Sequence, residues 1–233
     1  MDELKKTIFK QHLKEIAKRL LRICFRKTEK SIEAKIDGAD VVSFDLYDTL
    51  ICRESGRPQA VFYKLGENAE QKQNSVDKDT FVFGRISAER KARSENGKEE
   101  ITLFQIYNNM EFIPQKEKLE AIKLEEQMEE ADAITLETGK RLYEYALRNH
   151  KKIIITSDMY LSGNVIKRIL EKNNYSGYEE IYLSSERKDS KATGKLFERI
   201  KIDNPKCRVL HIGDNVRTDL FNARRNGISA VII

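Results

Sequence analysis

Short apolar runs rich in β-branched residues recur along the chain, and amphipathic segments separate them. Runs of this length and composition predict strands, whereas apolar residues three and four positions apart predict helices. Strands that are apolar throughout are typical of a parallel sheet covered on both faces. The pattern therefore predicts an α/β fold with a doubly wound parallel sheet. The predicted strands are residues 41–46, 152–156, 180–184, 208–212 and 229–233.

Helices are predicted between these strands over residues 137–149, 162–173, 193–201 and 216–226. Ser162 stands where an N-cap is expected, and Gly227 stands where the residue after a helix often adopts a positive φ. These elements alternate with the strands, as right-handed crossover connections require.

A long insertion, residues 47–151, separates the first two predicted strands. A plain crossover needs only about 12 residues, so we expect a separate subdomain here. Apolar residues at helical spacing predict helices at 58–71, 79–95, 101–111 and 115–135. We expect a helical cap over residues 55–135, with 36–54 and 136–233 forming the core. The Lys- and Glu-rich part of the cap, residues 115–130, is expected to be a solvated helix face.

Two carboxylates, Asp45 and Asp48, share the loop that follows the first predicted strand. One carboxylate can attack phosphorus, and a second can protonate the departing oxygen and then activate water. An Asp at a strand end is also a common turn or capping residue, so this loop alone leaves both interpretations open.

Three further segments supply the other charges that phosphoryl transfer needs. Thr156 and Ser157 end a predicted strand, Lys191 precedes a helix, and Gly213-Asp214 is followed by Asn215 and Asp219. Ligands bind outside the carboxyl ends of the strands in such sheets, so we expect these side chains to meet.

Together these segments resemble the four ordered motifs of the haloacid dehalogenase (HAD) superfamily of hydrolases, over roughly residues 41–233. We interpret 45–49 as the superfamily's Asp-x-Asp-x-Thr loop, with Asp48 as the second aspartate. The resemblance implies a Rossmann-like core with an inserted cap. Segments 48–53, 85–93 and 156–160 are also similar to a branch that is often encoded with, or fused to, bacterial glycosyltransferases.

The resemblance implies a role for each motif residue. Asp45 would be the nucleophile and Asp48 the acid/base, while Thr156, or alternatively Ser157, would donate a hydrogen bond to the phosphoryl group. Lys191, or alternatively Lys195, would neutralise Asp45 and the transferring group. Thr49 would contact the substrate. Arginines of the insertion are candidates to hold an anionic substrate: Arg53, Arg85, Arg90 and Arg93.

A magnesium ion is expected because an anionic nucleophile must approach an anionic phosphate. Asp45, Asp214 and the backbone carbonyl of Asp48 are the implied ligands. Asn215 would hold a metal-bound water, and Asp219 would support the ligands from behind.

The predicted function is magnesium-dependent hydrolysis of a small phosphate monoester, such as a sugar phosphate, through an aspartyl-phosphate. An acid at Asp48 favours phosphate esters over carbon–halogen bonds, because a halide leaves without protonation. The alternatives are a phosphotransferase or phosphomutase that uses the same intermediate, and a non-catalytic partner module of a glycosyltransferase.

The net charge of +5 is concentrated in residues 1–35, which carry +6 on their own. An apolar stripe that includes Leu13, Ile16, Leu20 and Ile23 predicts an amphipathic helix there. It could pack on the core or a second copy, dock a partner protein, or lie on an anionic membrane surface. The almost neutral remainder argues against nucleic acid as a partner. The three cysteines show no metal-ligand spacing, and the absence of a signal or membrane-spanning run predicts a cytoplasmic protein.

Overall fold

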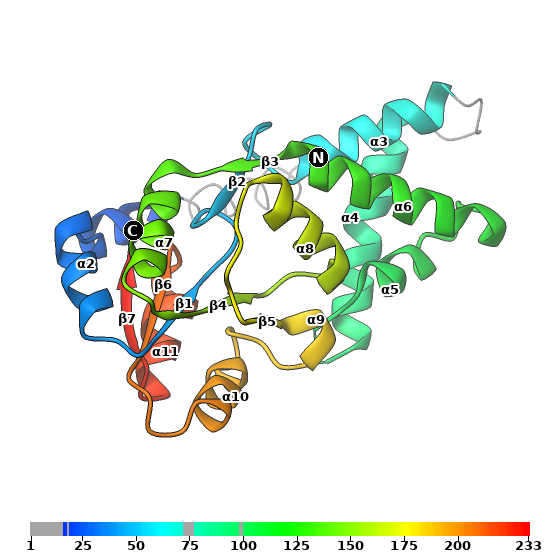
Figure 1. Cartoon of the computed structure of the whole chain (residues 1–233). Coiled ribbons are helices and arrows are strands. Elements are labelled where there is room, and N and C mark those ends of the chain that lie inside the picture. Colours follow the sequence, from blue (N-terminus) through cyan, green and yellow to red (C-terminus); the bar gives the residue numbers. More distant parts are fainter. Residues whose placement is uncertain (1–15, 18, 72–76, 98–99) are drawn as a thin grey trace.

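A five-stranded parallel sheet forms the centre of the computed structural model, which describes residues 16–17, 19–71, 77–97 and 100–233 (Figure 1). The strand order is β5-β4-β1-β6-β7, and every neighbouring pair is parallel. The predicted α/β fold is therefore confirmed, and each strand lies within two residues of its predicted range. The strands are β1 (Val41–Phe44), β4 (Lys152–Ser157), β5 (Glu180–Leu183), β6 (Val209–Gly213) and β7 (Ser229–Ile232).

Helices cover both faces of this sheet. On β1, Val42 packs into one apolar cluster with the first group of helices, while Val41 packs into a second cluster with the other group. This division explains why the strands are apolar at consecutive positions. The first group is α2 (Glu29–Asp37), α7 (Glu137–Arg148) and α8 (Gly163–Lys172), and the second is α10 (Lys195–Asp203), η1 (Val216–Asn222) and α11 (Ala223–Arg225). A short helix, α9 (Ser184–Arg187), follows β5.

Two predicted helix ends differ in detail from the observed ones. The last predicted helix begins as a π-helix, η1, and becomes α-helical only at α11. Ser162 lies at the N-cap of α8, but its side chain makes no capping bond, and Glu186 accepts the hydrogen bond from the Gly163 amide instead. Gly227 follows the helix with a φ of 71°, as predicted.

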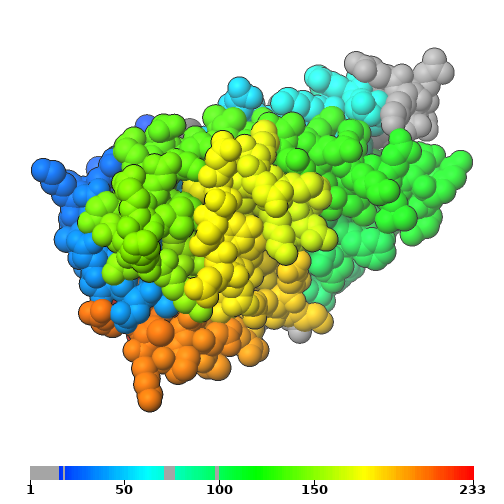
Figure 2. All heavy atoms as spheres, in the orientation of Figure 1, coloured from blue at the N-terminus to red at the C-terminus, as the bar shows by residue number. Residues whose placement is uncertain are grey.

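Between residues 55 and 135, the described part of the insertion contains four helices: α3 (Gln59–Gln71), α4 (Lys78–Glu95), α5 (Leu103–Asn108) and α6 (Gln115–Asp132). Its apolar residues, such as Phe81 and Ile106, belong to the same cluster as Val42 and Phe44 of the sheet. In Figure 2 the helices between residues 55 and 135 form the right-hand part of a continuous surface, next to α8. The division of the chain into core and cap stays a prediction.

A two-stranded antiparallel ribbon joins the insertion to the sheet domain. Its strands, β2 (Ile51–Arg53) and β3 (Ala133–Thr135), were not predicted. Each has three residues, too few for an alternating pattern to stand out. The ribbon brings the two ends of the insertion together.

The charged stretch of α6 is only in part a solvated face. Lys116 and Lys123 are exposed, as expected, but the other side of the helix is buried. Glu125 and Glu129 are fully buried, and both face arginines of the insertion. Leu119 on the same helix is 61% exposed. The inward face of α6 is therefore acidic because its partners inside the insertion are cationic.

The N-terminal segment is attached to the edge of the sheet. Residues 19–25 are helical, Arg26 forms a bridge to Ile232 of β7, and the Phe25 ring packs edge-on against Phe221. Ile16, Leu20 and Ile23 are exposed. The first 15 residues of the predicted amphipathic helix lie outside the described residues. Among the helices that the structure describes, none has the length and apolar character needed to cross a bilayer.

Candidate active site

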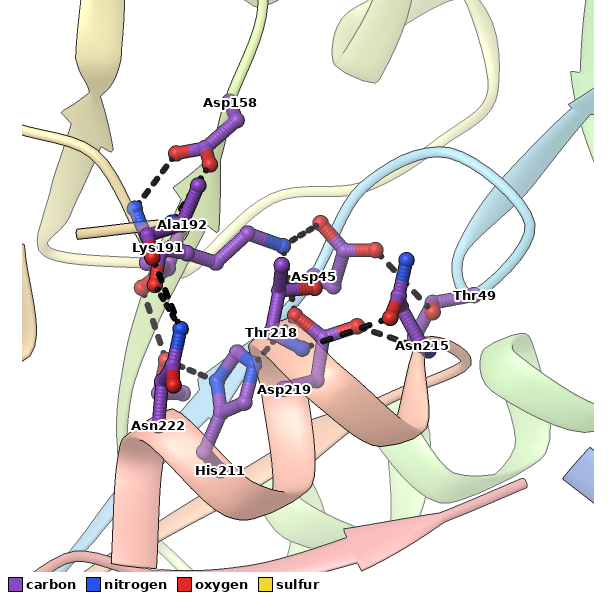
Figure 3. A network of polar contacts seen from close by, with 12 residues as sticks. Asp45, Thr49, Asp158, Lys191, Ala192, His211, Asn215, Thr218, Asp219 and Asn222 are labelled. Carbon is purple, nitrogen blue, oxygen red and sulfur yellow. Dashed lines mark hydrogen bonds and ion pairs between the residues drawn. The ribbon is translucent and has the colours of Figure 1, made fainter. Parts of the chain in front are cut away.

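The carboxyl ends of the three central strands bring the motif side chains together (Figure 3). Asp45 follows β1, Ser157 ends β4 and Asp214 follows β6, so the parallel arrangement places all three at one edge of the sheet. They line a pocket of about 640 Å³ between this edge and the insertion. The insertion contributes Arg53, Pro58, Gln59, Phe62, Ile86, Glu89, Arg90 and Arg93 to the lining.

Lys191 lies between two buried carboxylates. Its Nζ donates to Asp45 Oδ1 at 2.5 Å and to Asp219 Oδ1 at 2.7 Å. Burial alone would lower the pKa of Lys191, but the carboxylates of Asp219 and Asp45 outweigh it and raise that pKa. Lys195 is exposed at the start of α10. The structure therefore brings Lys191, and not Lys195, to Asp45.

Three carboxylates converge on one small volume. One oxygen each of Asp45, Asp214 and Asp219 lies within 4.8 Å of the others. Burial, followed by repulsion from Asp219, raises the pKa of Asp214 to about 7, and burial raises the pKa of Asp45 well above its usual value. Two described cations face these three carboxylates: Lys191 contacts Asp45 and Asp219, and Arg22 lies 3.5 Å from Asp214. The cluster is therefore still short of positive charge. Oxygen ligands with unbalanced negative charge fit a hard divalent cation such as Mg²⁺.

Gly213 permits this close arrangement. A Cβ atom built at Gly213 would lie 2.5 Å from Asp219 Cγ, which no real side chain tolerates. The glycine is therefore needed for Asp219 to reach the site beside Asp214. This close approach gives a physical reason for the Gly-Asp pair that the sequence contains.

Asp219 and Asn215 are bonded mainly to the protein itself. Asp219 Oδ1 accepts from Lys191, and Oδ2 accepts from the Asn215 amide at 2.9 Å. The side-chain oxygen of Asn215 accepts from the Arg217 and Thr218 amides and caps η1. Asp219 is thus placed as a support for Lys191. The expected role of Asn215 with a metal-bound water stays a prediction, and the structure gives its side-chain oxygen a capping role.

A buried chain of hydrogen bonds reaches the back of the site from the middle of the sheet. His211 Nε2 lies 3.3 Å from Asp219 Oδ1, its Nδ1 lies 2.8 Å from Ser43 Oγ, and Ser43 Oγ lies 2.7 Å from Thr156 Oγ1. Burial lowers the pKa of His211, so the ring is neutral near pH 7 and carries one proton. His211 is thus a core residue with both ring nitrogens bonded, and it also supports Asp219.

The direction of this chain follows from its charged end. An ionised carboxylate only accepts, so His211 Nε2 donates to Asp219 and Nδ1 accepts from the Ser43 hydroxyl. Ser43 must then accept from Thr156, so the proton of the Thr156 hydroxyl points into the sheet. Thr156 is fully buried and does not line the pocket, whereas Ser157 does. Ser157 therefore faces the pocket in the position expected for Thr156.

Thr49 is also buried, outside the pocket lining. Its hydroxyl lies 3.5 Å from Asp45 Oδ2, at the outer limit of a hydrogen bond. Thr49 thus contacts the Asp45 carboxylate, which differs from the expected contact with substrate.

The placement of Asp48 differs from the prediction. Asp48 is exposed, has a φ of 58° and does not line the pocket. It also stands three residues after Asp45, one more than the Asp-x-Asp-x-Thr spacing requires, and Tyr47 occupies the second position. Tyr47 lines the pocket and donates its hydroxyl proton to Glu129. The interpretation of Asp48 as the second aspartate of the motif was wrong.

The candidate arginines fall into three situations. Arg85 is fully buried and bonded to Glu125 and Glu89, so its assignment to substrate was wrong. Arg53 lines the pocket, but its guanidinium is held by Glu129, and Arg93 is paired with Glu89 and Glu100. Arg90 lines the pocket, is exposed, and has no carboxylate partner among the residues that the structure describes.

Two residues without a predicted role hold the Lys191 loop (Figure 3). Asp158 accepts from the backbone amides of Lys191 and Ala192, and Asn222 donates to the backbone carbonyls of the same two residues. Asp158 follows Ser157 directly, which is a signal that could have found it. Asn222 has no comparable signal, because only the packing of η1 brings it to this loop.

A cation from the N-terminal segment also reaches the site. Arg22 Nη2 donates to the Asp48 carbonyl at 3.1 Å, and Nη1 lies 3.5 Å from Asp214 Oδ2. Its Nε donates to the Ile233 carbonyl. The Asp48 carbonyl and Asp214, both implied as metal ligands, thus lie within reach of one guanidinium.

The fold is similar to that of solved HAD-like hydrolases. A 2-haloacid dehalogenase from Pseudomonas syringae superposes with a TM-score of 0.59 at 14% identity, covering 82% of this chain and 85% of the other. A HAD phosphatase from Thermococcus onnurineus superposes with a TM-score of 0.55 at 15% identity, covering 83% of this chain and 86% of the other. A HAD family enzyme from Bacteroides thetaiotaomicron was solved with magnesium and inorganic phosphate. It superposes with a TM-score of 0.53 at 18% identity, covering 84% of this chain and 94% of the other. No protein-family model matches the sequence, and no curated protein is significantly similar to it.

Proposed function

We propose that this chain, whose fold is that of the HAD-like hydrolases, removes a phosphoryl group from a small molecule with the help of a divalent cation. The observation that carries the proposal is the cluster of Asp45, Asp214 and Asp219 around a single ammonium group. Asp45 also faces a pocket large enough for a small metabolite.

Asp45 is the proposed nucleophile. Its carboxylate oxygen attacks phosphorus, the bond from phosphorus to the leaving oxygen breaks, and an aspartyl-phosphate forms. Water then attacks phosphorus, which releases inorganic phosphate and regenerates the carboxylate. Lys191 keeps Asp45 oriented and offsets its charge, while the hydroxyl of Ser157 donates to a phosphoryl oxygen.

A divalent cation, with Mg²⁺ as the proposed one, would be held by the carboxylates of Asp45 and Asp214, with a backbone carbonyl of the loop that follows Asp45. When bound, it would neutralise carboxylate and phosphoryl charge. Asp219 positions Lys191 and the backbone amide of Asn215 around the site.

The acidic cluster favours phosphoryl chemistry over carbon–halogen cleavage. Displacement of a halide by a carboxylate gives no reason to gather two further carboxylates beside the nucleophile, because they raise its pKa and repel an anionic haloacid. Phosphoryl transfer with a cation makes use of them. Because Asp48 is exposed, it does not place an acid in the pocket that would favour phosphate esters over carbon–halogen bonds. Halide release is therefore measured as well.

The insertion is proposed to act as a cap that selects substrate. It closes one side of the pocket. Arg90, which has no carboxylate partner in the described part of the chain, offers its guanidinium to an anionic or hydroxyl-rich remainder of the substrate. Transfer of the phosphoryl group to a second acceptor molecule would use the same residues. No substitution therefore distinguishes transfer from hydrolysis, but competition between water and an added acceptor does.

The test is phosphate release from an aryl phosphate, and halide release from a 2-haloacid, each with Mg²⁺ and with EDTA. We expect phosphate release that requires Mg²⁺ and that falls on the order of 1,000-fold or more in Asp45→Asn. The control is Lys195→Gln, which changes an exposed lysine of the same region. Halide release, or phosphate release that persists in Asp45→Asn, would contradict the proposal.

A further inference from the structure

We infer that the substrate is an activated phosphoryl compound, an acyl phosphate or phosphoanhydride, whose leaving group departs as a stable anion without a proton from the protein. This inference rests on the proposed function and narrows its substrate class. Its basis is that, in the described part of the pocket lining, each acidic side chain is bonded elsewhere or lies with the cation site.

The two residues nearest to the expected acid do not supply a proton. The Asp48 side chain is exposed and outside the pocket lining. Tyr47 lines the pocket, but its one hydroxyl proton is donated to Glu129 at 3.2 Å. The guanidinium of Arg53 lies over the Tyr47 ring, 4.1 Å from its centroid, and binds the same carboxylate. Tyr47 is thus fixed between two partners of the insertion. Tyr160, the other phenol of the lining, donates its hydroxyl proton to Glu129 as well, at 3.3 Å.

The remaining carboxyl groups of the described lining are also engaged. Glu89 binds the guanidinium groups of Arg85 and Arg93 with one oxygen each. Asp158 accepts a backbone amide proton on each of its oxygens, from Lys191 and Ala192. A proton on either group would occupy an oxygen that now accepts one of these bonds and would weaken that bond.

The cationic and metal-facing groups complete the set. Lys191 directs its ammonium at Asp45 and Asp219, so the loss of a proton would leave both carboxylates without their partner. Asp214 and Asp219 belong to the cation cluster. Among the lining residues that the structure describes, none is free to protonate a leaving oxygen.

The chemical consequence is a limit on the leaving group. As Asp45 bonds to phosphorus, the electron pair of the breaking bond stays on the leaving oxygen, which takes its proton later from solvent. A positioned acid contributes on the order of 100- to 10,000-fold, so alkyl phosphates should lose about this factor here. Acyl phosphates and anhydrides do not need it, because a carboxylate or a phosphate leaves as a stable anion.

The experiment compares kcat/KM of the wild-type protein with Mg²⁺ across acetyl phosphate, pyrophosphate, a series of aryl phosphates with increasingly basic phenols, and glycerol phosphate. We expect turnover of acetyl phosphate or pyrophosphate, a steep fall along the aryl series, and a value for glycerol phosphate on the order of 100-fold or more below the most reactive aryl phosphate. Equal turnover of glycerol phosphate and the aryl phosphates would overturn the inference while leaving the proposed function intact. Absence of phosphate release from every compound would instead remove the proposed function.

Variants at Tyr47 sharpen the comparison. Tyr47→Asp places a carboxyl group in the pocket and should raise the ratio of glycerol phosphate to aryl phosphate turnover. Tyr47→Phe removes the same bond to Glu129 without adding an acid, so it should leave that ratio as in wild type, and so should Asp48→Asn. A fall of this ratio in Asp48→Asn would identify Asp48 as the acid and would overturn the inference.

Discussion

Ser157 and Thr156 are neighbours on β4, but their hydroxyls face opposite surroundings. Ser157 faces the pocket, while Thr156 donates its proton into the sheet towards Ser43. The alternation of side chains along a strand makes this difference unavoidable for adjacent residues. The sequence could identify the pair but could not say which member faces the pocket, because that depends on how β4 sits beside β1.

These two hydroxyls provide a matched pair of variants. Ser157→Ala should lower kcat/KM for the best substrate on the order of 100-fold, because it removes a donor to the phosphoryl group. Thr156→Val should keep most of the activity but lower the free energy of unfolding by about 1–3 kcal/mol, because Ser43 loses its donor. Steady-state kinetics and urea denaturation check both. A larger loss of kcat/KM in Thr156→Val than in Ser157→Ala would instead assign Thr156 as the donor to the phosphoryl group.

Lys191 is the residue on which the charge balance depends. In Lys191→Met, Asp45 and Asp219 stay buried without their cation, so we expect a loss of about 3–5 kcal/mol in the free energy of unfolding without metal. Lys195→Met, four residues on and exposed, should change it by less than about 0.5 kcal/mol. Urea denaturation measures the free energy of unfolding of both variants. Equal losses in the two would contradict the assignment of Lys191 as the cation that balances Asp45 and Asp219.

At the scale of elements, α7 packs against the loop that carries Asp45, the proposed nucleophile. A Cβ atom at Gly139 would lie 1.9 Å from the Thr49 carbonyl oxygen. This contact is between backbones, so no side-chain rotation can relieve it. The helix itself was predicted from its apolar spacing. The close approach was not predicted, because a single glycine in a helix does not by itself indicate a contact with another backbone.

Gly139→Ala should therefore push α7 and the Asp45–Thr49 loop apart. We expect a loss of about 1–3 kcal/mol in the free energy of unfolding, together with lower kcat/KM, because Thr49 contacts the Asp45 carboxylate. Arg148→Ala, at the exposed end of the same helix, is the control. Unchanged stability in Gly139→Ala would show that the helix can shift without cost.

The helix α6 shows where a charge pattern in sequence has no unique meaning. Its Lys- and Glu-rich composition is typical of a solvated face, yet Glu125 accepts from Arg85 and from the Tyr107 hydroxyl inside the insertion. Both partners come from other helices. A buried carboxylate needs such partners, and one sequence does not show which helices will meet.

At the scale of the whole molecule, the strand positions and the site at their carboxyl ends could be predicted because both follow from local composition and the rules of parallel sheets. The placement of Asp48 could not. Residues 45–51 form a tight turn in which Asp48 donates its backbone amide to the Ile51 carbonyl and adopts a positive φ. One position within that turn decides whether a carboxylate faces the pocket or the solvent.

The N-terminal segment is also linked to the site, through Arg22. Since Arg22 contacts Asp214 and the Asp48 carbonyl, Arg22→Gln should bind Mg²⁺ more tightly, by about two- to fivefold for a partly exposed ion pair. Arg19→Gln removes the same charge from the same segment and should have a smaller effect. Isothermal titration calorimetry measures the affinity. An affinity that is unchanged or weaker in Arg22→Gln would contradict this competition.

This contact has a thermodynamic consequence that reaches beyond the site. Suppose that Arg22 and the cation compete for Asp214. Attachment of residues 22–27 to β7 then weakens cation binding by some factor, and cation binding must weaken that attachment by the same factor. The bridge of Arg26 to Ile232 and the bond from the Lys27 amide to the Ile232 carbonyl would then report on metal occupancy. Hydrogen exchange at the Lys27 amide would then report, from the edge of the sheet, on the occupancy of the proposed cation site at the end of the neighbouring strand, β6.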